Sequence, residues 1–113
     1  GEIPLKANSG YKGSIADPKE REWFRKVMEV VNFIGNDRTW KGKIVQISVT
    51  KGGDLILVPR EGKEKFLFGQ PEDIESKFAK LEKYYTHIIP AKGEGHYRTV
   101  DLKYKGQIVC REK

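Results

Sequence analysis

The chain has 113 residues, of which 37% are hydrophobic and 34% charged. This length allows one domain, and the apolar fraction is too high for a wholly disordered protein. The net charge of +6 permits contact with nucleic acid, anionic lipid or an acidic protein without selecting any of them. Cys110 is the single cysteine, which excludes an intramolecular disulfide, and no apolar run approaches the roughly 18 residues of a membrane span.

The N-terminal part predicts an extended segment followed by a helix. Residues 1–16 mix Pro, Gly and Ser with isolated apolar residues, which is typical of an extended lead-in with at most a short strand near residues 3–5. Asp17 is a good N-cap, Pro18 suits the first helical position, and Gly35 is expected to end the helix. The spacing i, i+3, i+4, i+7 predicts one buried face, formed by Phe24, Val27, Met28, Val31 and Ile34.

Three strands are predicted next. From Lys43 the hydrophobic period changes to two, which places Val45, Ile47 and Val49 on one face of a strand and residues 44, 46 and 48 on the other. Residues 51–54 form a hairpin turn, and a second strand covers 55–58, with Pro59 at its end or at a sheet edge. After a turn at 61–63, residues 66–68 form the third strand.

A second helix and two more strands complete the predicted order. The helix opens near Pro71, with acids in its first turn, and its apolar stripe is Ile74, Phe78, Leu81 and Tyr85. Its lysines, at 77, 80 and 83, are expected on a solvated face. After a loop at 90–95, Val100, Leu102 and Tyr104 alternate in a fourth strand, and residues 107–111 form the last. The order αβββαββ predicts one α+β domain over residues 17–113, with an antiparallel sheet and two covering helices.

No residue pattern in the chain points to catalysis, a metal or a cofactor. His87, His96 and Cys110 lack the close paired spacing of a zinc site. The glycines at 93 and 95 are not followed by the helix that a phosphate loop requires. Glu72 and Asp73 could form a catalytic carboxylate pair, but their position in the first turn of the helix accounts for them without catalysis. The serines lack the signature of an activated nucleophile. We therefore expect a non-enzymatic protein without a cofactor.

Two binding interpretations remain open at this point. The last strand ends close to the C-terminus, so it is expected at a sheet edge, where its unpaired backbone groups could accept a strand from a partner. In the competing interpretation, Lys and Arg side chains protect this edge against pairing with another strand. The alternative function is a basic nucleic-acid-binding module that stacks bases on the Tyr and Phe side chains of the sheet. Glu75 and Glu82 lie among the helix lysines and offset their field.

The final hairpin resembles the end of the extracytoplasmic region of the bacterial cell-division family FtsQ/DivIB. The residues Val-Asp-Leu-Lys-Tyr at 100–104 stand where the family has a Val-Asp-Leu-Arg-Tyr strand, and residues 107–110 stand in its closing strand. Residues 3–11 are similar to the element that enters the family's β domain, residues 45–69 to its central meander, and residues 77–85 to its following helix. The resemblance thus covers nearly the whole chain.

The resemblance implies a non-enzymatic scaffold of the division machinery that takes part in septum assembly. It implies a periplasmic β domain that follows a transmembrane helix and a POTRA domain in a single-pass inner-membrane protein. It also implies FtsB-like and FtsL-like partners, with FtsB adding a strand beside the closing strand, and no nucleic acid. The outer surface of the helix around residues 72–85 is expected to assist docking.

The residues carried over to partner binding lie at the end of the chain. Lys103 replaces the usual Arg of the family, so the charge is kept but the planar fork is lost. The full set of expected contacts is Lys103, Tyr104, Gln107, Ile108, Val109, Cys110 and Arg111.

Overall fold

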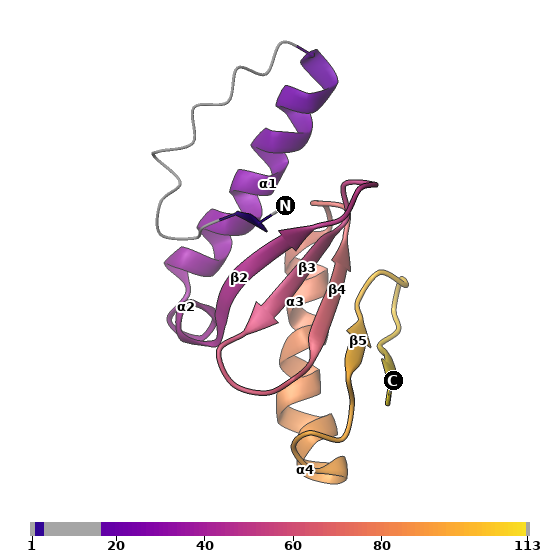
Figure 1. The fold of residues 1–113 in the computed structure, drawn as a ribbon. Helices are drawn as coiled ribbons and strands as arrows, with labels where there is room; N and C mark the ends of the chain where they lie inside the picture. The colour runs from indigo at the N-terminus through magenta and orange to yellow at the C-terminus, as the bar shows by residue number, and fades with distance from the viewer. Residues whose placement is uncertain (1, 4–16, 113) are drawn as a thin grey trace.

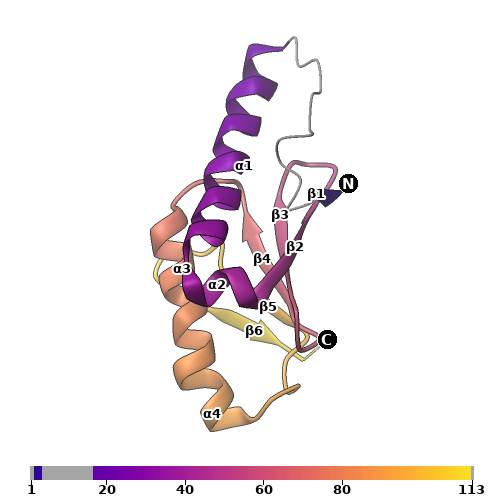
Figure 2. The ribbon, with the colours of Figure 1, turned by 90° about the vertical axis from the view of Figure 1, so that its left-hand side faces the viewer.

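The computed structural model describes residues 2–3 and 17–112, and within them six strands form one sheet in the order β1-β2-β3-β4-β5-β6 (Figure 1). The helices cover one face of this sheet (Figure 2). The strands are β1 (Glu2–Ile3), β2 (Ile44–Val49), β3 (Leu55–Pro59), β4 (Lys65–Gly69), β5 (Thr99–Asp101) and β6 (Val109–Arg111). The rest of the predicted lead-in, residues 1 and 4–16, lies outside the described residues.

The α+β class is confirmed, and the sheet is mixed rather than wholly antiparallel. Every neighbouring pair of strands is antiparallel except β4 and β5, which run parallel. The reason is the connection: the chain leaves β4, crosses the sheet face as a helix and returns to the same end, which is the link that parallel neighbours require. Hydrogen bonds from Lys65 N to Arg98 O and from Leu102 N to Leu67 O, both 2.9 Å, extend this parallel pair.

Helix α1 (Pro18–Asn36) begins as predicted, because the Asp17 side chain accepts a hydrogen bond of 2.9 Å from the amide of Lys19. It ends one residue after Gly35, and a short helix that the sequence pattern did not predict, α2 (Arg38–Lys43), follows at once. Asp37 caps α2 by accepting from the amides at 39 and 40, and thereby turns Trp40 into the core.

The start of β2 corrects the predicted alternation. The pairing with β3 shifts between Ile44 and Gln46, so Val45 is the extra residue of a β-bulge. Consequently Ile44 is 1% exposed and Val45 is 41% exposed, the reverse of the predicted faces. A strict period of two cannot predict a bulge. Beyond it the prediction holds, because Ile47 is fully buried and Val49 packs against the core.

The second long helix differs from its prediction at both ends. Helix α3 (Ile74–Lys83) starts after Pro71, and Asp73 stands at the N-cap in the left-handed region (φ 53°) without a capping hydrogen bond from its side chain. A π-helical turn, η2 (Tyr84–Ile88), leads into α4 (Ile89–Lys92), so the first three residues of the loop expected at 90–95 are helical, whereas residues 93–95 form a loop as predicted. The π-helical turn is wider than an α-helical turn, and this suits the residues before Pro90. Proline has no amide hydrogen, and in an α-helix its ring would clash with the carbonyl four residues earlier.

Aromatic side chains join the helices to the sheet. Phe78 of α3 stacks on Phe33 of α1, with ring centroids 4.6 Å apart, and lies 5.5 Å from the ring of Phe68 on β4. Tyr84 meets Phe66 edge to face at 5.7 Å. The buried hydrophobic core consists of Val27, Val30, Val31, Ile34, Trp40, Ile44, Ile47, Leu55, Leu57, Phe66, Phe68, Phe78, Leu81, Tyr84, Val100 and Leu102.

Candidate functional site

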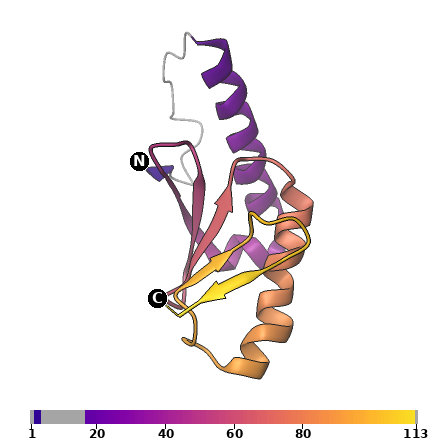
Figure 3. The same ribbon diagram turned by 90° about the vertical axis from the view of Figure 1, so that its right-hand side faces the viewer.

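The last strand lies at an edge of the sheet, as the sequence predicted. β6 pairs with β5 through the register Thr99 with Arg111, Val100 with Cys110 and Asp101 with Val109, and no further strand follows it in the sheet order of the described residues. Figure 3 shows β5 and β6 side by side. β6 is shorter than predicted, because Gln107 and Ile108 belong to the connection and not to the ladder.

Tyr104 lies in the turn between the two strands rather than in the fourth strand. The amide of Gln107 donates to the carbonyl of Tyr104 at 3.2 Å and closes the turn, which Gly106 assists with a φ of +70°. The Tyr104 side chain is 47% exposed. An exposed aromatic side chain beside an open strand is a typical feature of a surface that binds another protein.

Lys80 of α3 ties this turn to the helix layer. Its ammonium group donates to the carbonyl of Leu102 at 2.9 Å and also to the carbonyl of Tyr104. Both acceptors lie in the segment that links β5 to the turn. We expected all three lysines of this helix to face solvent. Lys83 is exposed as predicted, but Lys80 is half-buried and Lys77 is buried. A lysine at this position can reach backbone carbonyls that have no partner in the strand ladder.

Lys77 is buried on the same helix. It is 6% exposed, donates to the carbonyl of Gln70 at 2.9 Å and lies 4.7 Å from the centre of the Phe68 ring. Burial lowers the pKa of its ammonium group, because the charged form loses hydration. Lys77 thus fixes the loop before α3, and its position on the polar side of the sequence pattern gave no sign of this role.

A buried carboxylate organises the strands of the hairpin. Asp101 is 2% exposed, and its Oδ1 accepts from the amide of Lys103 at 3.0 Å. Its Oδ2 lies 3.5 Å from the guanidinium group of Arg111 and 3.8 Å from the ammonium group of Lys103. The stem of Lys103 also lies over Gly69, where an added Cβ would come within 2.6 Å of it. Asp101 therefore positions two of the predicted contact residues, although the sequence reasoning assigned it no role.

The remaining predicted contacts differ in exposure. Gln107 and Arg111 are exposed, whereas Ile108, Val109 and Cys110 are half-buried. Ile108 and Cys110 pack against the core, so their side chains support the edge from the helix side. Burial raises the pKa of the Cys110 thiol, which disfavours the reactive thiolate.

The two histidines, for which the sequence analysis found no zinc-site spacing, contact neighbouring residues in the structure. His87 contacts the hydroxyl of Thr86, and His96 stacks edge to face on Tyr97. No group of three His, Cys, Asp or Glu suited to a metal occurs in the part of the chain that the structure describes. Of the aromatic side chains considered for base stacking, Phe66 and Phe68 are fully buried and cannot contact a base, whereas Tyr104 is 47% exposed.

These features define a small α+β module whose sheet ends in an open edge strand with an exposed aromatic residue beside it. A sequence model of the family described as "FtsQ/DivIB, C-terminal related" matches residues 2–111, so the chain belongs to this family, which is related to cell-division proteins. The family is one of non-enzymatic division scaffolds, and its C-terminal domains are extracytoplasmic in general. No curated protein and no solved structure gave a significant match. Among the described helices, none is long and apolar enough to cross a membrane.

Proposed function

We propose that this domain binds FtsB-type and FtsL-type division proteins by strand addition at β6 during septum assembly. The single observation that carries the proposal is the position of β6 at the end of the sheet, in a chain that belongs to the FtsQ/DivIB-related family. A strand that pairs on one side only offers backbone groups which a partner strand can satisfy. The mechanism is binding rather than catalysis.

The side chains around the edge support this role by their exposure. Tyr104 and Gln107 are exposed in and after the turn, and Arg111 is exposed at the far end of β6. A partner strand beside β6 would lie within reach of all three, with an aromatic contact at one end and a positive charge at the other. Because side chains and the new backbone hydrogen bonds act together, both the turn and the strand contribute to specificity.

Helix α3 contributes to the same surface through Lys80. The two hydrogen bonds of Lys80 fix the backbone next to Tyr104 before any partner arrives. A contact residue that is held in place loses less conformational entropy on binding than a mobile one. The helix surface around residues 72–85 therefore assists docking at least through this link.

In the full protein, we assign residues 17–113 to a single β domain at the periplasmic side of the inner membrane. A transmembrane helix and a POTRA domain would precede it. The coherent core that joins both long helices to the sheet supports the assignment to a single domain.

Amide hydrogen exchange of the domain with and without a partner peptide tests the proposal. The probe is a synthetic peptide that covers the C-terminal strand segment of the FtsB-type protein from the same bacterium. We expect new protection concentrated in residues 107–111. The control peptide has the same side chains but methylated backbone nitrogens, which block strand pairing, and should give no protection.

Two results of this experiment would contradict strand addition at β6. If the unmodified peptide leaves exchange at 107–111 unchanged, or if the methylated peptide binds equally well, β6 does not receive a strand. Binding of unrelated oligonucleotides with a steep salt dependence would instead favour the nucleic-acid alternative.

A further inference from the structure

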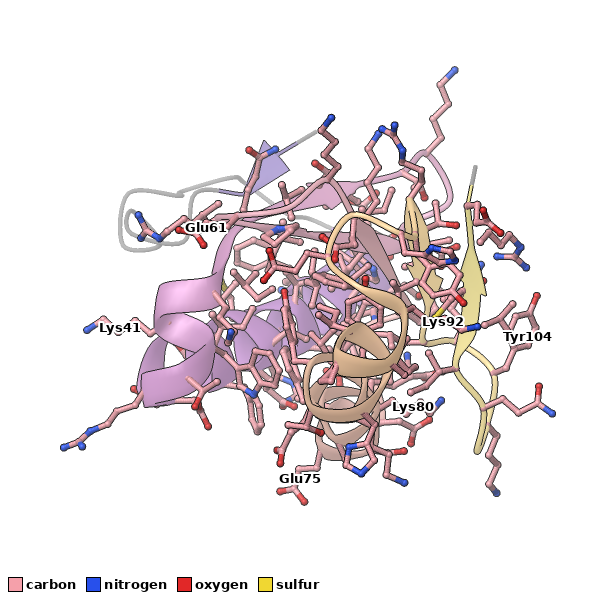
Figure 4. All side chains as sticks on the ribbon, turned by 90° about the horizontal axis from the view of Figure 1, so that it is seen from below. Lys41, Glu61, Glu75, Lys80, Lys92 and Tyr104 are labelled. Carbon is pink, nitrogen blue, oxygen red and sulfur yellow. The ribbon has the colours of Figure 1, made fainter. Side chains whose placement is uncertain are left out.

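A pocket of about 430 Å³ lies at the end of the sheet where α2 passes into β2. Its walls come from that junction, the turn that joins β3 to β4, the helical segment around Tyr85 and the loop that follows α4. Glu61, in the β3–β4 turn, and Tyr104, in the hairpin, lie on opposite sides of the molecule (Figure 4). The pocket therefore lies on the other side of the molecule from the turn around Tyr104, whereas Arg111, at the far end of β6, is aligned with Thr99 and Lys65 at the same end of the sheet as the pocket.

Glu64 in the wall of this pocket has an unsatisfied oxygen. The residue is 5% exposed, and its Oε2 accepts a hydrogen bond of 2.6 Å from the Tyr84 hydroxyl. Its Oε1 is buried and has no hydrogen-bond partner among the described residues. A buried carboxylate oxygen without a donor costs free energy, so the site is incomplete as the chain alone forms it.

Gly62 covers this oxygen within the β3–β4 turn. An added Cβ at this position would lie 2.2 Å from Glu64 Oε1, and the residue has a φ of +99°. Only glycine fits such a close approach in this conformation. Gly62 lies in an exposed surface turn, so a ligand that reaches Oε1 from the pocket would have to displace this turn.

The two cationic side chains of the pocket contact other groups and form no ion pair with its carboxylates among the described residues. The Arg60 guanidinium donates through Nε to the carbonyl of Gly42 at 3.0 Å, and the Lys43 ammonium lies 4.3 Å from the centre of the Tyr85 ring. No ion pair joins either cation to Glu64, or to the exposed Glu61 and Glu94, within the described ranges. The pocket thus carries three carboxylates without ion-pair partners in a chain whose net charge is +6.

We propose that this pocket receives the guanidinium group of an arginine side chain from a protein partner. A guanidinium fork can donate to Glu64 Oε1 and to a second carboxylate at once, with charge-assisted hydrogen bonds. The side chain of Ile89 offers an apolar wall for the methylene stem. The volume is large enough to admit one arginine side chain. This contact lies beyond the proposed strand addition and does not depend on it.

An NMR titration with two small probes tests this pocket directly. The probe is Nα-acetyl-arginine methylamide, and its control is the citrulline analogue, which has nearly the same shape but no charge. We expect the arginine probe to shift the backbone amides of residues 62, 64, 85 and 95, with at least tenfold weaker binding of citrulline. In Glu64→Gln the arginine affinity should fall at least fivefold, whereas Glu75→Gln, on the exposed surface of α3, should leave it unchanged.

The double variant Glu61→Gln/Glu94→Gln covers the case in which Glu64→Gln does not fold, since both residues are exposed. It should weaken the arginine probe at least threefold. The proposal is overturned if citrulline binds as well as arginine, if no amide around the pocket shifts, or if every folded charge variant keeps the original affinity.

Discussion

The central meander and the C-terminal hairpin are parts of one sheet, but different interactions stabilise them. Strands β2 to β4 have five or six residues each and place fully buried side chains such as Leu57 and Phe66 under the helices. Strands β5 and β6 have three residues each, and Asp101, Lys80 and a closed turn hold them in place. Apolar burial dominates the meander, whereas the outer part of the hairpin depends on polar contacts.

This difference suggests a division of roles, in which the meander supplies most of the stability and the hairpin supplies the proposed binding surface. Regions with few buried apolar contacts open at lower free energy than the core, and surfaces that bind partners are commonly drawn from them. Under the proposed strand addition, we expect the hairpin to adjust locally while the meander keeps the fold intact. Substitutions should reveal the division as large global effects in one region and local effects in the other.

The largest loss of stability is expected from Phe66→Ala in the meander. The ring is fully buried against Tyr84 and Tyr85, so its removal leaves a cavity. We expect a decrease of about 3–5 kcal/mol in the free energy of unfolding. Urea unfolding followed by tryptophan fluorescence measures it. A loss below about 1 kcal/mol would show that the meander is not the main source of stability.

The next effect is expected from Tyr84→Phe, which removes the only hydrogen bond to the Glu64 carboxylate in the described part of the chain. We expect a loss of about 1–3 kcal/mol near neutral pH, because a buried carboxylate is left without a donor. Urea unfolding at pH 7.5 checks the value. Tyr85→Phe is the matched control, since its hydroxyl has no hydrogen bond to Glu64 among the described contacts and should matter less.

The same variant should change the response to alkaline pH. Burial and the hydrogen bond to Glu64 raise the pKa of Tyr84 above its usual value of 10.0, so the unfolded state loses its proton first. The corresponding stabilisation is complete below pH 10 and is lost as the pH rises above it. Tyr84→Phe should therefore lose less stability between pH 9 and 11. Lys77, whose pKa is lowered, acts in the opposite direction in both proteins and cancels in the comparison.

The sequence predicted features set by neighbouring residues better than features set by contacts between distant ones. Strand β4 and the start of α1 follow from periodicity and capping, which are local properties of the chain. The bulge at Val45, the parallel pairing of β5 and the contacts of Lys80 and Asp101 depend on residues distant in sequence, which no local pattern encodes. The edge position of β6 was predictable because it follows from chain order.

A smaller and local effect is expected from Lys80→Met, which keeps the length of the side chain and removes its hydrogen bonds to Leu102 and Tyr104. The free energy of unfolding should fall by about 0.5–1.5 kcal/mol, and amide exchange should accelerate mainly at residues 102–107. Lys83→Met, at an exposed position on the same helix, is the control and should change neither. Acceleration spread evenly over the sheet would contradict a local role for Lys80.

The smallest effect on stability is expected from Tyr104→Ala, because the ring is 47% exposed in a surface turn. The free energy of unfolding should change by no more than about 0.5 kcal/mol. If the turn is part of the docking surface, the same substitution should weaken binding of the FtsB-type peptide about tenfold or more, as expected for an aromatic contact beside an added strand.

Calorimetric titration of the peptide against the wild-type domain, Tyr104→Ala and Val45→Ala measures this affinity. The two variants compare two exposed apolar residues, one in the hairpin and one in the meander. Equal affinities of all three proteins would remove Tyr104 from the interface, whereas a loss confined to Tyr104→Ala would assign binding to the region that contributes least to stability.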